Sequence, residues 1–344
     1  MSIERIGTTA AIFGCAGLSL GAEERDFFRS VDPAGFILFK RNCADPAQVR
    51  NLVADLRASV GRSDAPILID QEGGRVQRLR PPHWRAAPPA RRFAELYAQD
   101  PAAGLRAAWI NARLIAAELT DLGIDVDCAP VLDNPVPGAH DVIGDRALGT
   151  DVATIAALGR AVIDGFLAGG VLPVIKHLPG HGRAGVDSHL ECPIVDADDA
   201  ELRAEDLPPF RALADAPFAM TAHVVYTTWD AARVATWSPW IIQRVIRRDI
   251  GFSGCLLSDD LSMQALDGTL GERARRALTA GCDLALHCNG DLAEMRDVAA
   301  AAGTISPAAG IRLAAALARR TKPDPIDRPV LTAELDGLLK DRPL

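Results

Sequence analysis

Three histidines, one lysine and one aspartate lie between residues 176 and 189 of this chain. Residues 176–182 read KHLPGHG, and residues 187–189 read DSH. An imidazole held by a carboxylate transfers protons near neutral pH, and such a pair contributes little to a hydrophobic core. Glycines at positions 180, 182 and 185 allow this backbone conformations that other residues avoid. We therefore expect the segment to take part in chemistry.

The elements that must position these residues are indicated by short apolar runs, which alternate with longer stretches of helical pattern. The runs are 10–15, 35–39, 66–70, 124–129, 172–177, 217–223, 254–259 and 282–287. Most of them show no polar alternation, which is typical of parallel strands buried on both faces. Eight such units predict an α/β fold, a TIM-type (β/α)8 barrel that forms a single domain over residues 1–320.

Helix signals support this alternation. Residues 105–122 carry apolar side chains at helical spacing and stop at Gly123, Asp151 opens a second helix, and Ser238 with Pro239 opens a third over 240–249. The proline-rich residues 80–89 predict an extended loop. Residues 321–344 predict a short polar C-terminal tail that contains one short helix near 332–339.

Polar residues follow the apolar runs at the ends where such a barrel builds its active site. They include Asp70, Asp133, Lys176, His177, His223, Asp259, Asp260 and His287. Asp70 has two interpretations, a cap for the following turn or a carboxylate that accepts hydrogen bonds from ligand hydroxyls. Asp259 and Asp260 are neighbours on one strand and point to opposite sides, and periodicity does not decide which one enters the site.

Other chemistry is compatible with the same residues. His177, His181, His189 and Asp187 could form a metal site, joined by His223 and Asp259 from other strand ends, because zinc hydrolases built on barrels draw their ligands from several strands. The glycine-rich segment is a weak match to a phosphate-binding loop, since no lysine-serine pair follows it.

Composition narrows the class of protein. The 344 residues are 49% hydrophobic and 24% charged, as in a soluble globular protein, and the net charge of −8 disfavours nucleic-acid binding. No apolar run is long enough to span a membrane. The seven cysteines are odd in number and form no C-x-x-C pair, which predicts free thiols in a reducing compartment. Residues 8–20 predict a first core strand rather than an export signal, and hence a cytoplasmic protein.

Five motifs together resemble glycoside hydrolase family 3. They are IDQEGGRVQR at 69–78, IGDR at 143–146, KHLPGHG at 176–182, DSH at 187–189 and SDDLSM at 258–263. The similarity runs in order from about residue 10 to residue 300. More narrowly, the chain resembles the single-domain bacterial β-N-acetylglucosaminidases of peptidoglycan recycling.

The resemblance implies a retaining exo-enzyme that removes a non-reducing terminal GlcNAc from a small-molecule muropeptide or GlcNAc glycoside. The natural substrate would be GlcNAc-1,6-anhydro-MurNAc, with or without peptide, in the cytoplasm. Asp259 matches the family's nucleophile, and His189 with its partner Asp187 matches an unusual acid/base. Positions that hold the sugar are matched by Asp70, Arg78, Arg146, Lys176, His177 and His223. The resemblance implies no cofactor and no metal, and we expect a monomer that binds neither membrane nor nucleic acid.

Several alternatives remain open at this point. A family-3 enzyme can pass the sugar to phosphate instead of water. The N-acetyl group of the substrate could assist cleavage, with Asp259 or Asp260 as a polariser. A metal-dependent barrel hydrolase and an inactive sugar-binding protein are the candidates from other classes. The loop that carries His189 is expected to close on substrate.

Overall fold

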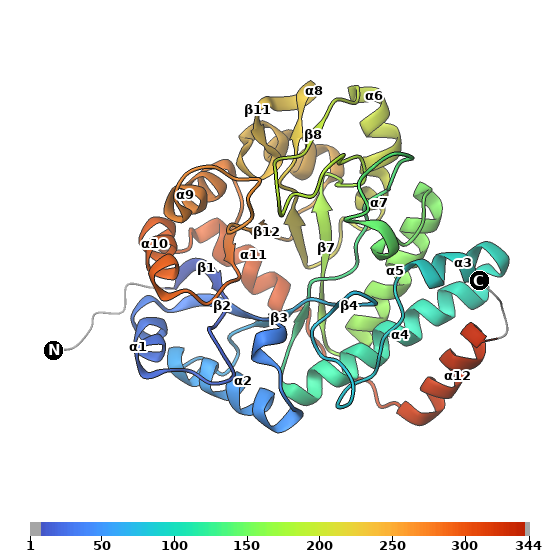
Figure 1. Cartoon of the computed structure of the whole chain (residues 1–344), viewed down its shortest axis with the longest axis horizontal. Helices are drawn as coiled ribbons and strands as arrows, with labels where there is room; N and C mark the ends of the chain where they lie inside the picture. Colours follow the sequence, from blue (N-terminus) through green and yellow to red (C-terminus); the bar gives the residue numbers. More distant parts are fainter. Residues whose placement is uncertain (1–7, 341–344) are drawn as a thin grey trace.

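The computed structural model describes residues 8–340, and at its centre eight parallel strands close into a barrel (Figure 1). Around the barrel they are β1 (Thr9–Phe13), β2 (Pro33–Leu38), β3 (Ile67–Ile69), β6 (Val126–Asp127), β7 (Leu172–Leu178), β9 (Phe218–Thr221), β12 (Cys255–Asp260) and β13 (Leu284–His287). Parallel pairing between β1 and β13 completes the closure. Each strand lies within or overlaps one predicted run, so the predicted fold class is confirmed.

The strands are apolar on both faces because each face has its own core. In β1, Ile12 points into the barrel, where it joins Leu68 and Leu257 among other buried side chains. Its neighbours Ala11 and Phe13 belong to a larger cluster between the strands and the surrounding helices. Successive side chains of a strand point to opposite faces, so both sets must be apolar. This arrangement explains why the runs lack alternation.

Helices surround the strands (Figure 1). They are α1 (Ala22–Val31), α2 (Pro46–Val60), α3 (Arg91–Gln99), α4 (Pro101–Leu122), α5 (Val152–Ala168), α7 (Leu207–Ala212), η5 (Ile241–Ile250), α9 (Leu270–Ala280), α10 (Leu292–Ala302) and α11 (Pro307–Leu317). The predicted end of α4, the start of α5 and both bounds of η5 hold within one residue, whereas α4 begins at Pro101, four residues before its predicted start. The Asp151 side chain accepts a hydrogen bond from the backbone of Thr154 at the start of α5, and Gly123 ends α4 in the left-handed region at φ 78°.

Shorter elements cover the carboxyl ends of the strands. The hairpin of β4 (Gln71–Gly73) and β5 (Val76–Gln77) follows β3 directly. A small sheet combines β8 (Ile194–Val195), β10 (Val225–Tyr226) and β11 (Ala231–Val234). Beside it lie α6 (Asp199–Glu201), η3 (Leu202–Asp206) and α8 (Thr227–Asp230) (Figure 1). Residues 80–90 contain no helix or strand, as predicted for 80–89.

The C-terminal helix α12 (Arg328–Lys340) is longer than the predicted 332–339 and packs on α4 (Figure 1). Leu331 and Leu335 are buried there, and Glu334 pairs with Arg106 at 2.7 Å. The boundary predicted at residue 320 falls between α11 and α12. Within residues 8–340, no helix combines the length and the apolar character needed to cross a bilayer.

Candidate active site

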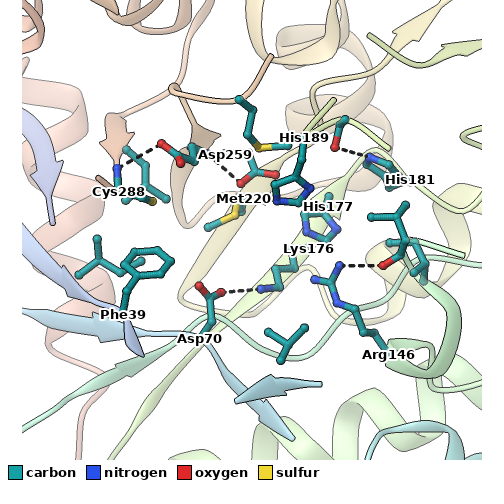
Figure 2. Close-up of a pocket in the computed structure, with 18 of the residues that line it drawn as sticks. Phe39, Asp70, Arg146, Lys176, His177, His181, His189, Met220, Asp259 and Cys288 are labelled. Atoms are coloured by element: carbon teal, nitrogen blue, oxygen red, sulfur yellow. Dashed lines mark hydrogen bonds and ion pairs between the residues drawn. The ribbon is translucent and has the colours of Figure 1, made fainter. Parts of the chain in front are cut away.

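A pocket of about 140 Å³ opens at the carboxyl ends of the strands (Figure 2). Seven of the nine predicted site residues line it: Asp70, Arg78, Arg146, Lys176, His177, His189 and Asp259. Phe39, Met220, Met263 and Leu286 add apolar wall, and His181, Ser188, Asp260 and Cys288 also contribute. The strands thus bring residues that are nearly 190 positions apart in the sequence to one cavity.

Five charged side chains form a network on one side of the pocket. Lys176 Nζ lies 2.9 Å from Asp70 Oδ1 and 2.8 Å from Glu72 Oε1. Arg78 binds the other oxygen of Asp70 at 3.0 Å, and Arg146 binds both oxygens of Glu72 at 2.8 Å. Figure 2 shows Lys176 directed at Asp70. Each of the two carboxylates, whose side chains are 14% and 7% exposed, is therefore paired with two cations.

The network keeps its carboxylates ionised. Burial alone would raise the pKa of Glu72, but the charges of Arg146 and Lys176 outweigh it and lower the value to about 2. Asp70 is shifted the same way, with burial opposed by Lys176 and Arg78. The pKa of Lys176 is raised because Asp70 and Glu72 outweigh the effect of burial. Ionised acceptors and fixed donors of this kind suit a ligand rich in hydroxyl groups.

Asp259 and Asp260, at the end of β12, both line the pocket, whereas the alternation of side chains on a strand predicts that only one enters it. Their hydrogen bonds distinguish them. Asp260 accepts from the backbone and hydroxyl of Ser262 at 3.0 and 2.5 Å and from the backbone of Cys288 at 3.1 Å. Asp259 accepts only from the backbone of Asp260, at 2.8 Å, among the described residues. One oxygen of Asp259 is therefore free to meet a ligand, whereas Asp260 organises the turn.

His189 and Asp187 form a pair on the loop after β7. Asp187 Oδ1 accepts from the His189 backbone at 2.9 Å and lies 2.7 Å from Nδ1 of the ring. Burial raises the pKa of Asp187, but the hydrogen bonds and charge of His189 outweigh it and lower the value overall. The His189 side chain is 63% exposed. Asp187 does not line the pocket and reaches it only through His189, so the pair can deliver or accept a proton at Nε2.

His223 lies outside the pocket. It is completely buried, its Nε2 donates to the backbone oxygen of Asp260 at 3.0 Å, and its Nδ1 lies 2.8 Å from Thr236 Oγ1. Both ring nitrogens are thus occupied by protein groups, and in this structure neither is available to a sugar. The position predicted to hold the sugar instead supports the turn that follows Asp259.

Glu72 and Asp133 were not among the predicted site residues. Glu72 pairs with Lys176 and Arg146, and Asp133 lies 2.6 Å from the Nδ1 of His177. Both are polar residues just beyond the end of a predicted strand, but that pattern alone assigns neither of them a role. Residues 8–340 contain no group of three or more His, Cys, Asp or Glu side chains arranged to hold a metal ion.

Comparisons of the sequence with known proteins point to one family. Residues 15–319 match the glycosyl hydrolase family 3 N-terminal domain. A β-hexosaminidase of Methylococcus capsulatus is 41% identical over 327 residues, which cover 94% of this chain and 94% of the relative. A β-hexosaminidase of Stenotrophomonas maltophilia is 40% identical over 287 residues, covering 82% of this chain and 84% of the relative.

Solved structures agree as well. NagZ from Neisseria gonorrhoeae in complex with N-trifluoroacetyl-D-glucosamine has a TM-score of 0.84 at 31% identity, over 98% of this chain and 97% of that one. A glycoside hydrolase family 3 β-N-acetylglucosaminidase from a Paenibacillus species has a TM-score of 0.85, also at 31% identity, over 98% of this chain and 68% of its own. The chain belongs to glycosyl hydrolase family 3 and is a glycosidase.

Proposed function

We propose that this glycosidase is a retaining exo-β-N-acetylglucosaminidase that releases terminal GlcNAc from cell-wall muropeptides. Its substrate would be GlcNAc-1,6-anhydro-MurNAc, with or without peptide, and the protein would act as a cytoplasmic monomer. The names of the relatives, β-hexosaminidase, support the reaction class. The proposal rests mainly on one observation: Asp259, with an oxygen free, and His189, held by Asp187, line the same pocket.

In the first step, Asp259 attacks the anomeric carbon while the bond to the leaving oxygen breaks. His189 Nε2 gives its proton to that oxygen, so the leaving group departs neutral and a glycosyl-aspartate remains. Asp187 stabilises the charged ring before transfer and fixes its orientation. In the second step, His189 takes a proton from water, the resulting hydroxide attacks the same carbon, and Asp259 leaves as a carboxylate.

The charged network supports this chemistry by fixing the sugar ring. Asp70 offers acceptors to the ring hydroxyls, while Lys176, Arg78 and Arg146 offer donors to hydroxyls and to the acetamido oxygen. Glu72 does not line the pocket, and its role would be to hold Lys176 and Arg146 in place. These side chains are already held by one another at 2.8 to 3.0 Å, so little side-chain freedom remains to be lost on binding. The loop that carries His189 would open to admit substrate and close around it, and its position here, with Ser188 beside His181, would be the closed one.

Turnover of 4-nitrophenyl β-GlcNAc tests the proposal. The wild type should release nitrophenol, and Asp259→Ala and His189→Ala should lose most activity while melting within a few degrees of the wild type. A 5-fluoro glycosyl fluoride of GlcNAc should label Asp259, which mass spectrometry of the peptide would locate. Absence of turnover by the wild type, or full activity of Asp259→Ala, would refute the assignment.

The same assay separates the alternatives. Sugar-1-phosphate as the main product in phosphate buffer would indicate phosphorolysis. An enzyme that turns over but is never labelled would indicate assistance by the N-acetyl group. Loss of activity with a chelator and its return with zinc would indicate a metal-dependent hydrolase. Comparing the rates for GlcNAc-1,6-anhydro-MurNAc with and without peptide tests the substrate directly.

A further inference from the structure

Asp133, which follows β6, collects three hydrogen bonds beneath the pocket. Its Oδ1 accepts from the backbone N–H of His177 at 3.1 Å and from that of His181 at 2.7 Å. Its Oδ2 lies 2.6 Å from His177 Nδ1. Burial raises the pKa of this carboxyl, but the nearby charges and hydrogen bonds of His177 and His181 outweigh it and lower the value to about 2. The group is therefore a carboxylate at neutral pH.

This carboxylate decides how His177 meets the pocket. An ionised carboxylate only accepts hydrogen bonds, so Nδ1 of His177 carries the proton between them. Nε2 is then the ring atom left for the pocket that His177 lines. Figure 2 shows His177, His181 and His189 grouped on one side of this pocket.

His177 in turn acts on the proposed nucleophile. Burial raises the pKa of Asp259, but attraction by His177, followed by His223, the backbone N–H of Asp260 and Lys176, outweighs it and lowers the value. Other titratable groups that interact electrostatically with Asp259 are His181, Cys128 and Cys288. His177 exerts the strongest attraction in this set.

A second set of hydrogen bonds connects Asp133 to the loop that carries the proposed acid/base, His189. The backbone of His181 is fixed by Asp133, and its ring Nε2 lies 3.1 Å from Ser188 Oγ. Ser188 is buried and stands between Asp187 and His189 in the chain. The backbone oxygen of Ser188 also accepts from the Ala265 N–H at 3.2 Å. The residue next to His189 is thus anchored to the pocket floor.

We propose that Asp133 is a positioning residue for both catalytic groups. Through His177 it orients a ring that attracts Asp259, and through His181 and Ser188 it holds the loop that carries His189 in the position seen here. The inference rests on the proposed roles of Asp259 and His189, and it assigns Asp133 no contact with the sugar.

The direct test is Asp133→Asn, which keeps the shape and the two backbone hydrogen bonds but removes the charge. The amide nitrogen would face His177 Nδ1 and disfavour a proton there. His177 attracts Asp259 more strongly than any other group does, and Asp133 is not among the main groups that act on it. A weaker attraction by His177 should therefore dominate the effect of the substitution. We expect kcat/KM to fall about 10-fold or more and its acid limb to move up by about one pH unit.

Two comparison variants separate this role from a general loss of stability. Asp283→Asn removes another buried, paired aspartate, which contacts Arg247 and Arg312 on the outer side of the strands' amino ends. In the pH profile of kcat/KM for Asp283→Asn, the acid limb should stay at the wild-type pH. Ser188→Ala should slow phenyl β-GlcNAc, whose poor leaving group needs a proton, more than 2,4-dinitrophenyl β-GlcNAc, and it should leave the acid limb in place.

A measurement on the wild type keeps the proposal testable if Asp133→Asn does not fold. Long-range proton–nitrogen NMR of the imidazoles, assigned with His177→Gln, should show His177 protonated at Nδ1. A neutral ring protonated only at Nε2 would overturn the proposal whatever the activity. If Asp133→Asn folds and the acid limb of its kcat/KM does not move, the positioning role of Asp133 is also overturned. Normal labelling of Asp259 in the wild type would still leave the proposed function intact.

Discussion

Lys176→Met tests whether the charged network stabilises the fold as well as the sugar site. The Lys176 side chain is 3% exposed, and its ammonium is shared by Asp70 at 2.9 Å and Glu72 at 2.8 Å. Methionine has a similar length without the charge, so the change removes one of the two cations from each of two largely buried carboxylates. Arg78 and Arg146 still pair with them. Because breaking a buried pair costs about 3 to 5 kcal/mol, we expect a loss near the lower value, about 3 kcal/mol.

The loss should depend on pH in a defined direction. In the wild type, the pKa values of Asp70 and Glu72 are lowered, so their pairing stabilises the fold above about pH 4.5 and is lost as the pH falls through the folded values. Without Lys176, the pKa of at least one carboxyl should rise above its unfolded value. That proton would be held by the folded state and released on unfolding, which penalises folding as the pH rises. The deficit should therefore be about 1 kcal/mol larger at pH 7.5 than at pH 5.0.

Urea unfolding followed by circular dichroism at the two pH values measures both quantities. Lys340→Met is the matched control, because Lys340 is 74% exposed and its Asp336 partner is 3.5 Å away. That control should cost about 0.5 kcal/mol or less, with little change between the two pH values. A Lys176→Met deficit below 1 kcal/mol, or one that is larger at pH 5.0, would refute the reasoning.

Three further outcomes are expected. Gly182→Ala should lower kcat/KM about 100-fold, because the new Cβ would lie 1.9 Å from the Asn134 backbone oxygen and would shift the loop. The control Gly185→Ala should keep a kcat/KM near that of the wild type, because its Cβ would meet nothing within 4 Å. The acid limb of wild-type kcat/KM should lie below about pH 4, since the pKa of Asp259 is lowered from 3.8; a midpoint above pH 5 in a pH–rate profile would contradict this. All seven cysteines are free and five are buried, so Ellman's reagent at pH 8 should modify no more than two thiols, Cys43 and Cys192, in the native protein and all seven in guanidinium. Rapid reaction of three or more would mean that the core opens easily.

Much of the fold follows from local pattern. The runs around 172–177 and 282–287 are apolar because each strand faces one core inside the barrel and another under the helices. A strand that is buried on both faces is a continuous apolar run, which can be recognised in the sequence without knowing which strands lie beside it. The end of α4 at Gly123 and the start of α5 at Asp151 can also be predicted from the sequence, because a capping residue acts on the backbone beside it.

The C-terminal helix shows the limit of such signals. Residues 321–329 are mostly polar and contain three prolines, so the sequence predicts a later start than the structure has. Packing of Leu331 and Leu335 on α4 and the pairing of Glu334 with Arg106 stabilise the extra turn. These contacts join residues more than 200 positions apart, and local propensity does not contain them.

The sequence by itself determined the barrel and the carboxyl ends of its strands as the place of chemistry, since both depend on periodicity and on residue type. Only the tertiary structure decided which of Asp259 and Asp260 keeps a free oxygen, because Ser262 and Cys288 occupy Asp260. It likewise turned His223 away from the pocket and placed Asp133 beneath it. A side chain's role depends on which hydrogen-bond partners the fold brings to it, and those partners come from distant strands.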